Sequence, residues 1–188
     1  MQPVTLSLLR MIPFVAGTVF VAGVVHISTI LLMPLVAGQT AAARLSGGAQ
    51  PNALETLQQA SGETMLVPFA DPSLQTATCQ YNVREAPVRL RIQTGDHFLS
   101  IVFISENGRL IYALTDKAAT RKTIDILVLT ESQLRQVEAQ DPDDEPIQEL
   151  RLRVSEPKGL AVIRAFVPRA SDQQVVVALL ERGVCKVE

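Results

Sequence analysis

The sequence contains no tryptophan, and aromatic residues make up only 4% of its 188 residues. Stacking platforms for bases or sugars are therefore not expected, because such platforms need exposed aromatic rings. The chain also lacks a basic excess, since 17 Lys and Arg stand against 19 Asp and Glu, for a formal net charge of −2. We therefore expect no nucleic-acid partner, because binding to phosphates requires a strongly basic face.

Motifs that carry catalysis or cofactor binding are also missing. The sequence has no phosphate-binding glycine loop and no glycine elbow around a nucleophilic serine. The acidic run DPDDEP at residues 141–146 lacks the glycine and the spaced glutamate of an EF-hand loop, which favours a solvated loop over a calcium site. No catalytic, cofactor-binding or metal-ligating residue is predicted, and no cofactor is expected.

Histidine is scarce, and His97 is the only one of two histidines that lies outside the long apolar run. It follows Asp96, and Asp116 and Asp125 come later, so an acid–base or metal site is one interpretation. The sequence Gly95-Asp96-His97 is also typical of a polar turn before a strand, and this is the preferred interpretation.

Apolar residues are abundant near the start of the chain, and residues 11–38 include no formally charged side chain. The most apolar part, residues 11–33, would be about 35 Å long as a helix. A hydrocarbon core is about 30 Å thick, so this segment can span it with some tilt. The run is too long for a secretory signal, whose apolar region has about 7–15 residues. We expect an uncleaved anchor, with a cleaved signal as the alternative.

The charges beside this run predict its orientation. Arg10 and the amino terminus lie close to one end, whereas the first basic residue after the run is Arg44. The positive-inside rule then puts the N-terminus in the cytoplasm and residues 40–188 outside it. The predicted organisation is a membrane anchor at residues 1–38, a linker of small and polar residues at 39–51, and an extracytoplasmic domain at 52–188. The lipid bilayer is itself a predicted partner.

His26 lies inside the apolar run, where an imidazole is costly and therefore a functional candidate. On a helix it shares a stripe with Ala16 and Gly23, whose small side chains allow a second helix to approach closely. His26 could hydrogen-bond across such an interface, in self-association or with another envelope protein. The alternatives are a neutral imidazole bonded to its own backbone or directed toward the membrane surface and, less favoured, a proton or metal site.

After residue 87 the apolar period changes to two, which predicts half-buried β-strands. Asn107-Gly108 separates two apolar runs and predicts a hairpin, because both residues tolerate positive φ. We expect six to eight strands, mostly paired with their sequence neighbours, in a mainly antiparallel α+β sheet or sandwich domain. The expected strands include PVRLRIQ, HFLSIVFIS, RLIYALT, TIDILVLT, QELRLRV with Leu150, Leu152 and Val154 inward, and GLAVIRAFVP.

Short helices are expected around these strands. Residues 52–60 fit a helix capped by Asn52, and Thr130 with Gln133 makes a capping box for a second helix. Residues 171–185 fit a C-terminal helix with a capping box of Ser171 and Gln174.

Two of the expected strands carry arginines between their apolar residues. If both strands belong to one sheet, these arginines share an outer face that could bind an anionic ligand or lipid headgroups. The preferred alternative is an ordinary solvated face, with the arginines paired to Glu85, Glu149 or Asp125. The four are Arg89, Arg91, Arg151 and Arg153.

Cys79 and Cys185 are the only cysteines, and both lie in the part that we expect outside the cytoplasm, where disulfides persist. We predict that they form a disulfide, which would tie the C-terminal segment back onto the start of the sheet. The alternative is two separate buried thiols, each behaving as a small apolar residue.

Several stretches, taken in order, resemble a known family. They are a single N-terminal span with VHI followed by MP, then FADPSLQTATCQYNV, APVRLRI, FLSIVFISENGRLIYALTDKAAT, IDILVLTESQL, GLAVIRAFVP and a terminal VC. The chain resembles a family of bacterial envelope proteins defined by a domain of unknown function of the twelve-fifty-four type. The resemblance covers most of the chain and implies a membrane-anchored bacterial protein, often a companion of related envelope proteins. It transfers no catalytic residue, and larger members carry extra β domains and tryptophan motifs that this chain lacks.

The sequence therefore predicts a single-pass protein of the bacterial inner membrane, with its N-terminus in the cytoplasm and its domain in the periplasm. Its expected role is that of a non-catalytic binding or accessory module of the envelope. The alternative is an exported hydrolase or lyase that uses His97 and nearby carboxylates. That alternative requires His97 in a concave pocket, with a second polar group within hydrogen-bonding reach.

Overall fold

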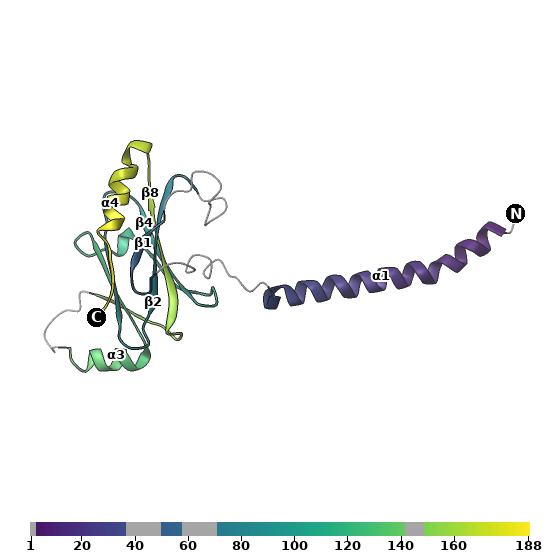
Figure 1. The fold of residues 1–188 in the computed structure, drawn as a ribbon, viewed down its shortest axis with the longest axis horizontal. Coiled ribbons are helices and arrows are strands. Elements are labelled where there is room, and N and C mark those ends of the chain that lie inside the picture. Colours follow the sequence, from purple (N-terminus) through teal and green to yellow (C-terminus); the bar gives the residue numbers. More distant parts are fainter. Residues whose placement is uncertain (1–2, 37–49, 58–70, 142–148) are drawn as a thin grey trace. The chain divides into compact units, whose positions relative to one another are not determined.

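The computed structural model describes residues 3–36, 50–57, 71–141 and 149–188, and in the first segment it describes the side chains of residues 11–33. The chain divides into two compact units, Met1–Gln39 and Thr40–Glu188. The first holds one helix and the second holds a β domain (Figure 1). Most of the predicted linker at residues 39–51 lies outside the described residues.

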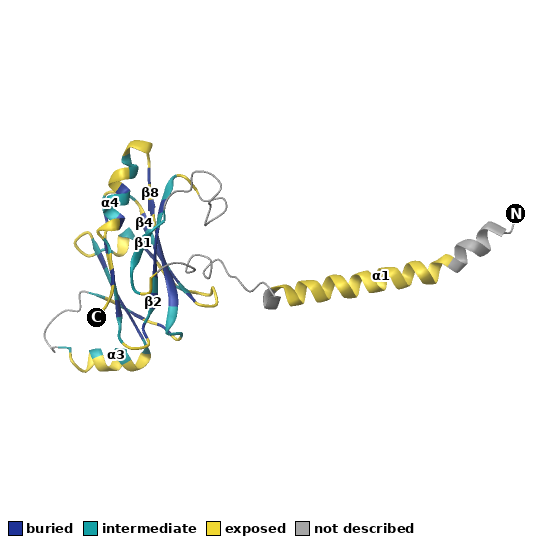
Figure 2. Cartoon of the chain, in the orientation of Figure 1, coloured by how far each residue is buried: buried dark blue, intermediate teal, exposed yellow. Residues whose placement is uncertain are grey.

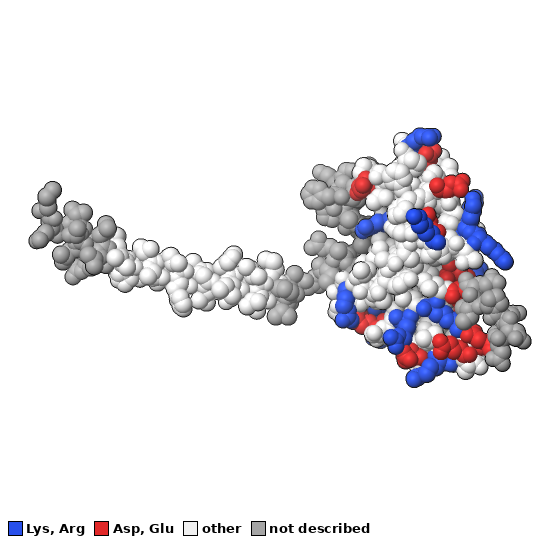
Figure 3. Space-filling model, turned by 180° about the vertical axis from the view of Figure 1, so that it is seen from behind, with Lys and Arg blue, Asp and Glu red and all other residues white. Residues whose placement is uncertain are grey.

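The first unit is the helix α1 (Pro3–Val36). Its stretch Met11–Met33 is long and apolar enough to cross a membrane, and none of that stretch is buried inside the protein. In Figure 3 the described part of this helix is white throughout, because it holds no Lys, Arg, Asp or Glu side chain. The predicted apolar helix near the N-terminus is present, and it is consistent with a single-pass anchor.

The second unit is built from two β-sheets (Figure 1). The five-stranded sheet has the order β1-β2-β8-β4-β5, and its neighbouring strands are antiparallel. The four-stranded sheet has the order β7-β6-β3-β9, with one parallel pair, β6–β7. The strands are β1 (Leu54–Thr56), β2 (Leu74–Asn82), β3 (Val88–Gln93), β4 (Leu99–Ser105), β5 (Leu110–Thr115), β6 (Thr123–Leu129), β7 (Leu150–Arg153), β8 (Lys158–Phe166) and β9 (Val184–Val187).

The core lies between the two sheets, where the buried residues of the strands gather (Figure 2). In strands such as β3 and β4 the buried residues alternate along the chain. In β3, Val88, Leu90 and Ile92 are buried, whereas the arginines between them point to the opposite face. From the five-stranded sheet, Tyr81 and Phe103 meet in the core with ring centroids 6.3 Å apart. The mainly antiparallel α+β sandwich with a C-terminal helix is therefore confirmed.

In the described part of the second unit, two α-helices accompany the sheets. The helix α3 (Glu131–Glu138) begins at the predicted capping box, in which Thr130 and Gln133 each bond the other's backbone N–H through their side chains. The helix α4 (Gln173–Glu181) contributes Val176 and Leu180 to the core. Short 3₁₀ turns, η1 (Asp116–Ala118) and η2 (Ala170–Asp172), precede β6 and α4.

The prediction of a helix at residues 52–60 is wrong for the residues that the structure describes, because β1 occupies part of that range. Asn52 does not cap a helix. It adopts a φ of 60°, its side chain accepts from Asn82 N at 2.8 Å, and its own N–H donates to Gln80 O. An isolated helix of nine residues is marginal, whereas pairing with β2 supplies backbone partners along the segment.

The C-terminal helix is shorter than predicted, and its predicted capping box is absent. Asp172 stands at the N-cap position without a side-chain capping bond, and Ser171 lies in η2. The chain leaves the helix after Glu181 and turns at Gly183, whose N–H donates to Leu180 O. A Cβ at Gly183 would lie 2.9 Å from the backbone oxygen of Leu180 and 2.5 Å from Ile92 Cδ1, so a larger residue would force its neighbours to shift. The residues that follow form β9.

Strand pairing is less local than the pattern predicts. β8 lies between β2 and β4, and β3 lies between β6 and β9, so the central pairs join segments far apart in sequence. Leu152 and Val154 are buried as predicted, but Leu150 is 38% exposed. Leu150 opens the edge strand β7, where the end of a sheet leaves side chains open to solvent.

Cys79 and Cys185 are joined in a disulfide, as predicted. Cys79 lies in β2 and Cys185 in β9, so the bond connects the two sheets across the core. Their Cα atoms are 6.3 Å apart, within the range for bonded cysteines, and both residues are buried. The bond closes a loop with a sequence separation of 106 residues.

We predict that replacing both cysteines, Cys79→Ala with Cys185→Ala, lowers the free energy of unfolding by about 2–5 kcal/mol, because the unfolded chain regains the freedom of a long loop. Denaturant titration of the full chain in detergent, followed by circular dichroism, measures this loss. A reducing agent should destabilise the natural sequence and leave the double variant unchanged. Equal stability of the oxidised protein and the variant would contradict the prediction.

Candidate functional site

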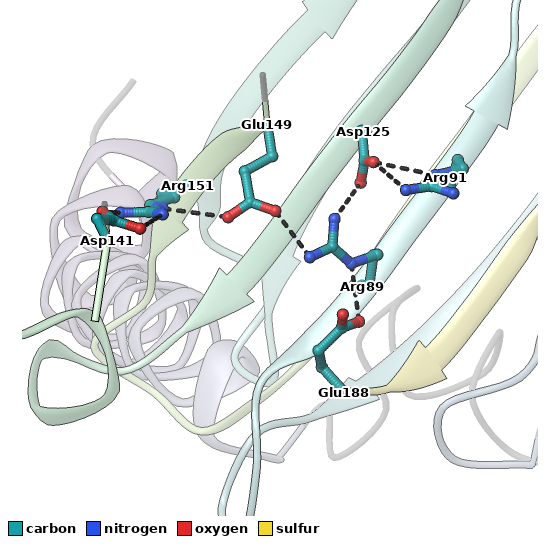
Figure 4. Close-up of polar contacts among 7 residues, drawn as sticks. All are labelled: Arg89, Arg91, Asp125, Asp141, Glu149, Arg151 and Glu188. Carbon is teal, nitrogen blue, oxygen red and sulfur yellow. Dashed lines mark hydrogen bonds and ion pairs between the residues drawn. The ribbon is translucent and has the colours of Figure 1, made fainter. Parts of the chain in front are cut away.

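A chain of ion pairs crosses the outer face of the four-stranded sheet (Figure 4). Arg89 and Arg91 project from β3 and Arg151 from β7, on the side away from the core. β6 lies between these strands, and its register places Asp125 opposite Arg91 and Leu127 between the other two arginines. The strands β3 and β7 therefore belong to one sheet. This was the condition under which their arginines were expected to share an outer face.

Arg89 is the centre of this network. Its Nη1 lies 3.1 Å from Asp125 Oδ1, its Nη2 lies 2.7 Å from Glu149 Oε2, and its Nε lies 2.7 Å from Glu188 Oε2. Only 17% of its side chain is exposed. Burial lowers the pKa of Arg89, but the hydrogen bond to Glu188 and the three carboxylate charges together raise this pKa above its ordinary value. Arg89 is therefore a permanent positive charge, and it connects the three segments that carry Asp125, Glu149 and Glu188.

The network continues on both sides of Arg89. Asp125 also accepts from Arg91 Nε at 2.9 Å, and Glu149 Oε1 lies 3.2 Å from Arg151 Nε. Arg151 also makes a two-pronged contact with Asp141, with 2.7 Å between Nη2 and Oδ1. This hydrogen-bonded fork holds the pKa of Asp141 below its ordinary range. Three arginines thus meet four carboxylates (Asp125, Asp141, Glu149 and Glu188), which leaves one surplus negative charge.

The predicted anion-binding face is thus occupied by the protein's own carboxylates. Arg153, the fourth arginine, pairs with Glu131 of α3, with 2.6 Å between Nη1 and Oε2. An anion would have to displace a carboxylate from each arginine that it contacts. The alternative interpretation named Glu149 and Asp125 correctly, whereas Glu85 takes part in no ion pair of the described residues.

Sequence reasoning missed Asp141 and Glu188 as partners of the arginines. Asp141 follows α3, and Glu188 follows β9, so neither lies in a strand that carries one of the arginines. No spacing pattern links Glu188 to Arg89, because 99 positions separate them. The remaining residues of the acidic run at 141–146 lie outside the described part of the chain.

His97 lies in the connection between β3 and β4 and is half-buried. Its neighbour Asp96 pairs with Lys122, with 3.1 Å between Oδ1 and Nζ, and Asp116 accepts weakly from Leu99 N. Within the described ranges His97 has no hydrogen-bonding partner, and no three His, Cys, Asp or Glu side chains come together as a metal site. The structure therefore does not bring the candidate acid–base residues together.

His26 lies on the exposed surface of α1. The hydroxyls of Thr18 and Thr29 bond back to Phe14 O and Val25 O, each at 2.8 Å, so they are satisfied within the helix. The imidazole of His26 has no such partner among the described residues. The interface predicted for Ala16, Gly23 and His26 requires a second helix, and it stays a prediction.

Comparison with family models and with curated proteins finds no match for this chain. Among solved structures, the VPA0106 protein from Vibrio parahaemolyticus is similar to it with a TM-score of 0.55 at 10% identity, over 76% of this chain and 32% of that one. An uncharacterised protein from Burkholderia cenocepacia has a TM-score of 0.45 at 12% identity, over 74% and 35%. This chain spans about a third of the length of both. The first likeness shows the fold alone, and the family resemblance drawn from the motifs stays a prediction.

We predict that Arg89→Met lowers the free energy of unfolding by about 2 kcal/mol, because three partly buried carboxylates lose their common partner. Arg153→Met is the matched control on the same face. Its side chain is 65% exposed, so its loss should cost about 0.5 kcal/mol or less. Denaturant titration of both variants measures the difference, and equally small losses would show that the network does not stabilise the sheet.

We also predict that His26→Leu leaves membrane insertion intact and weakens helix association by about 1 kcal/mol, the usual scale of polar contacts within membranes. Energy transfer between labelled copies in vesicles measures the association. Ile27→Leu, one position along, serves as the control because it changes no polar group. Unchanged energy transfer in the His26 variant would mean that the imidazole has no partner on a second helix.

Proposed function

We propose that this chain is a single-pass protein of the bacterial inner membrane that holds a non-catalytic binding module in the periplasm. The observation that carries the proposal is the exposed apolar helix attached to a separately folded β domain. Between residues 11 and 33, every described side chain is exposed, and 14 of them are large and apolar.

The free energy of lipid burial supports the anchor. Burying a large apolar side chain contributes roughly 1.5 kcal/mol or more, so the whole set favours the bilayer by on the order of 20 kcal/mol. That is far more than a reversible surface contact needs, and it is typical of a spanning helix. The helix is also long enough to span.

Two observations support the periplasmic side for the domain. Arg10 precedes the span, and the next basic residue, Arg44, comes well after it. The bond between Cys79 and Cys185 also fits an oxidising compartment, where disulfides persist. The binding role is supported by the edge strands of the two sheets, because an edge strand presents backbone N–H and C=O groups to a partner. The charged face is internally paired and gives this role no support.

Reporter fusions after Glu188 test the topology. We expect activity from a reporter that works only in the periplasm, none from one that works only in the cytoplasm, and retention of the full-length chain in membranes at alkaline pH. Arg10→Glu should lower the periplasmic fraction, because it removes the positive flank, whereas Arg10→Lys should not. Activity of the cytoplasmic reporter would reverse the topology, and a shortened mature chain would replace the anchor with a cleaved signal.

A further inference from the structure

His26 is a polar side chain on the apolar stretch of α1, where every described residue is exposed. The hydroxyls of Thr18 and Thr29 bond to carbonyls of their own helix, but the imidazole has no hydrogen-bonding partner among the described residues. A polar group without a partner is costly in hydrocarbon. The described residues contain one candidate span, so a neighbouring helix that pairs with His26 belongs to another chain.

The helix face around His26 follows a heptad pattern. Successive residues on this face are separated alternately by three and four positions, the spacing at which two helices pack in a left-handed coiled coil. Most bundles of membrane-spanning helices pack with the same hand. His26 is the only polar side chain of this His26 face, which consists of Ala16, Val19, Gly23, His26, Ile30 and Met33.

Gly23 lies one turn before the imidazole and leaves room for a second backbone. A Cβ placed at Gly23 would meet nothing within 4 Å, so the space beside it is open. Lipid tails are as apolar as the helix, so close packing and hydrogen bonds rather than the hydrophobic effect hold spanning helices together. The His26 face offers both, because it has a small residue next to one hydrogen-bonding group.

We infer that α1 pairs with α1 of a second copy of this chain through the His26 face, with a hydrogen bond between the two imidazoles. Copies inserted by the same rule share one orientation in the membrane, so two paired copies are parallel. A two-fold axis along the membrane normal then places each residue of the face opposite the same residue of the other copy, at the same depth. His26 therefore meets His26 of the second copy.

The chemistry of imidazole favours a second copy as the partner. A neutral imidazole donates through one ring nitrogen and accepts through the other. Two such rings therefore complete one N–H···N hydrogen bond, whereas two lysines or two arginines could not, because these side chains only donate. A symmetric pair thus needs no other polar group on the His26 face, and the face has none.

The inference rests on the proposed membrane anchor. Confinement of the copies to one bilayer raises their effective concentration, so one hydrogen bond with close packing is enough to populate the pair. The experiments therefore use the full chain in a membrane.

The first test places the photo-cross-linker p-benzoylphenylalanine at position 33 or at position 31 of the full chain in native membranes. Met33 and Leu31 are 61% and 69% exposed. Met33 belongs to the His26 face, whereas Leu31 lies about 160° away around the helix. We expect cross-linked homodimers from position 33 and none from position 31. Equal yields from both positions, no dimer from position 33, or cross-links from position 33 to a different protein would each overturn the inference.

The second test asks whether the two imidazoles bond each other. Energy transfer between labelled full chains, in vesicles of phosphatidylethanolamine and phosphatidylglycerol, measures three pairs: natural with natural, His26→Leu with His26→Leu, and natural with His26→Leu. The pair of two variants should be about fivefold weaker than the natural pair. Because the bond needs both rings, the mixed pair should be as weak as the pair of two variants. A mixed pair of intermediate or natural strength would overturn the imidazole pairing.

The third test fills the open space on the face. Gly23→Leu should lower the yield of cross-links from position 33 several-fold. Gly17→Leu is the matched control, because a Cβ at Gly17 also meets nothing within 4 Å but Gly17 lies on the other side of the helix. Equal yields from the two variants would overturn the contact through the His26 face.

Alkaline extraction of the same membranes keeps this inference apart from the proposed function. Release of the chain would overturn the anchor, whereas a retained chain without cross-links would overturn only the pairing of α1.

Discussion

Burial of two apolar sheet faces against each other is the constraint on which the β domain depends. Each sheet has one face that water disfavours, and the alternating strands direct their large side chains to that face. The five-stranded and four-stranded sheets therefore need each other, and α4 adds Val176 and Leu180 to the same core. The disulfide between β2 and β9 joins the two layers covalently. Loss of contact between the layers would expose both faces at once.

The outer faces of the two sheets differ in the side chains that they present to solvent. On the four-stranded sheet, arginines and carboxylates neutralise each other almost completely, and Arg89 alone binds three acidic partners. On the five-stranded sheet, the central strand β8 is apolar on both sides, with Leu160 and Val162 buried in a second cluster. The charged face is internally satisfied and leaves little affinity for a free anion.

An anchored protein can use contacts that a soluble one cannot. Copies held in one bilayer meet at high effective concentration, so one polar contact between helices or one added strand can be populated without a large interface. In this chain, His26 on the exposed apolar helix α1 is the candidate for such a contact between helices.

The local sequence is sufficient to predict the helices and strands that depend on interactions between nearby residues. The apolar stretch Met11–Met33 of α1 follows from the uncharged run, and β3 follows from the alternation of Val88, Leu90 and Ile92. The capping box of α3 was predictable because Thr130 and Gln133 lie three positions apart and each side chain accepts from the other's backbone N–H. Segments with an ambiguous local preference were decided by tertiary pairing. Residues 54–56 became β1 because β2 offers backbone partners.

The strand β9 and the network of ion pairs also depend on tertiary contacts. Residues 184–187 became β9 because β3 offers an edge and Gly183 fits where a Cβ would meet Ile92. The sequence placed the four arginines on one possible face, but it did not reveal that Arg89 would find Glu188 at a distance of 99 positions. A pattern along the chain reports which side of a strand is apolar. The way in which the two sheets bury apolar surface together decides which strands become neighbours. The neighbouring strands in turn decide which charges meet, and this information is present only in the folded structure.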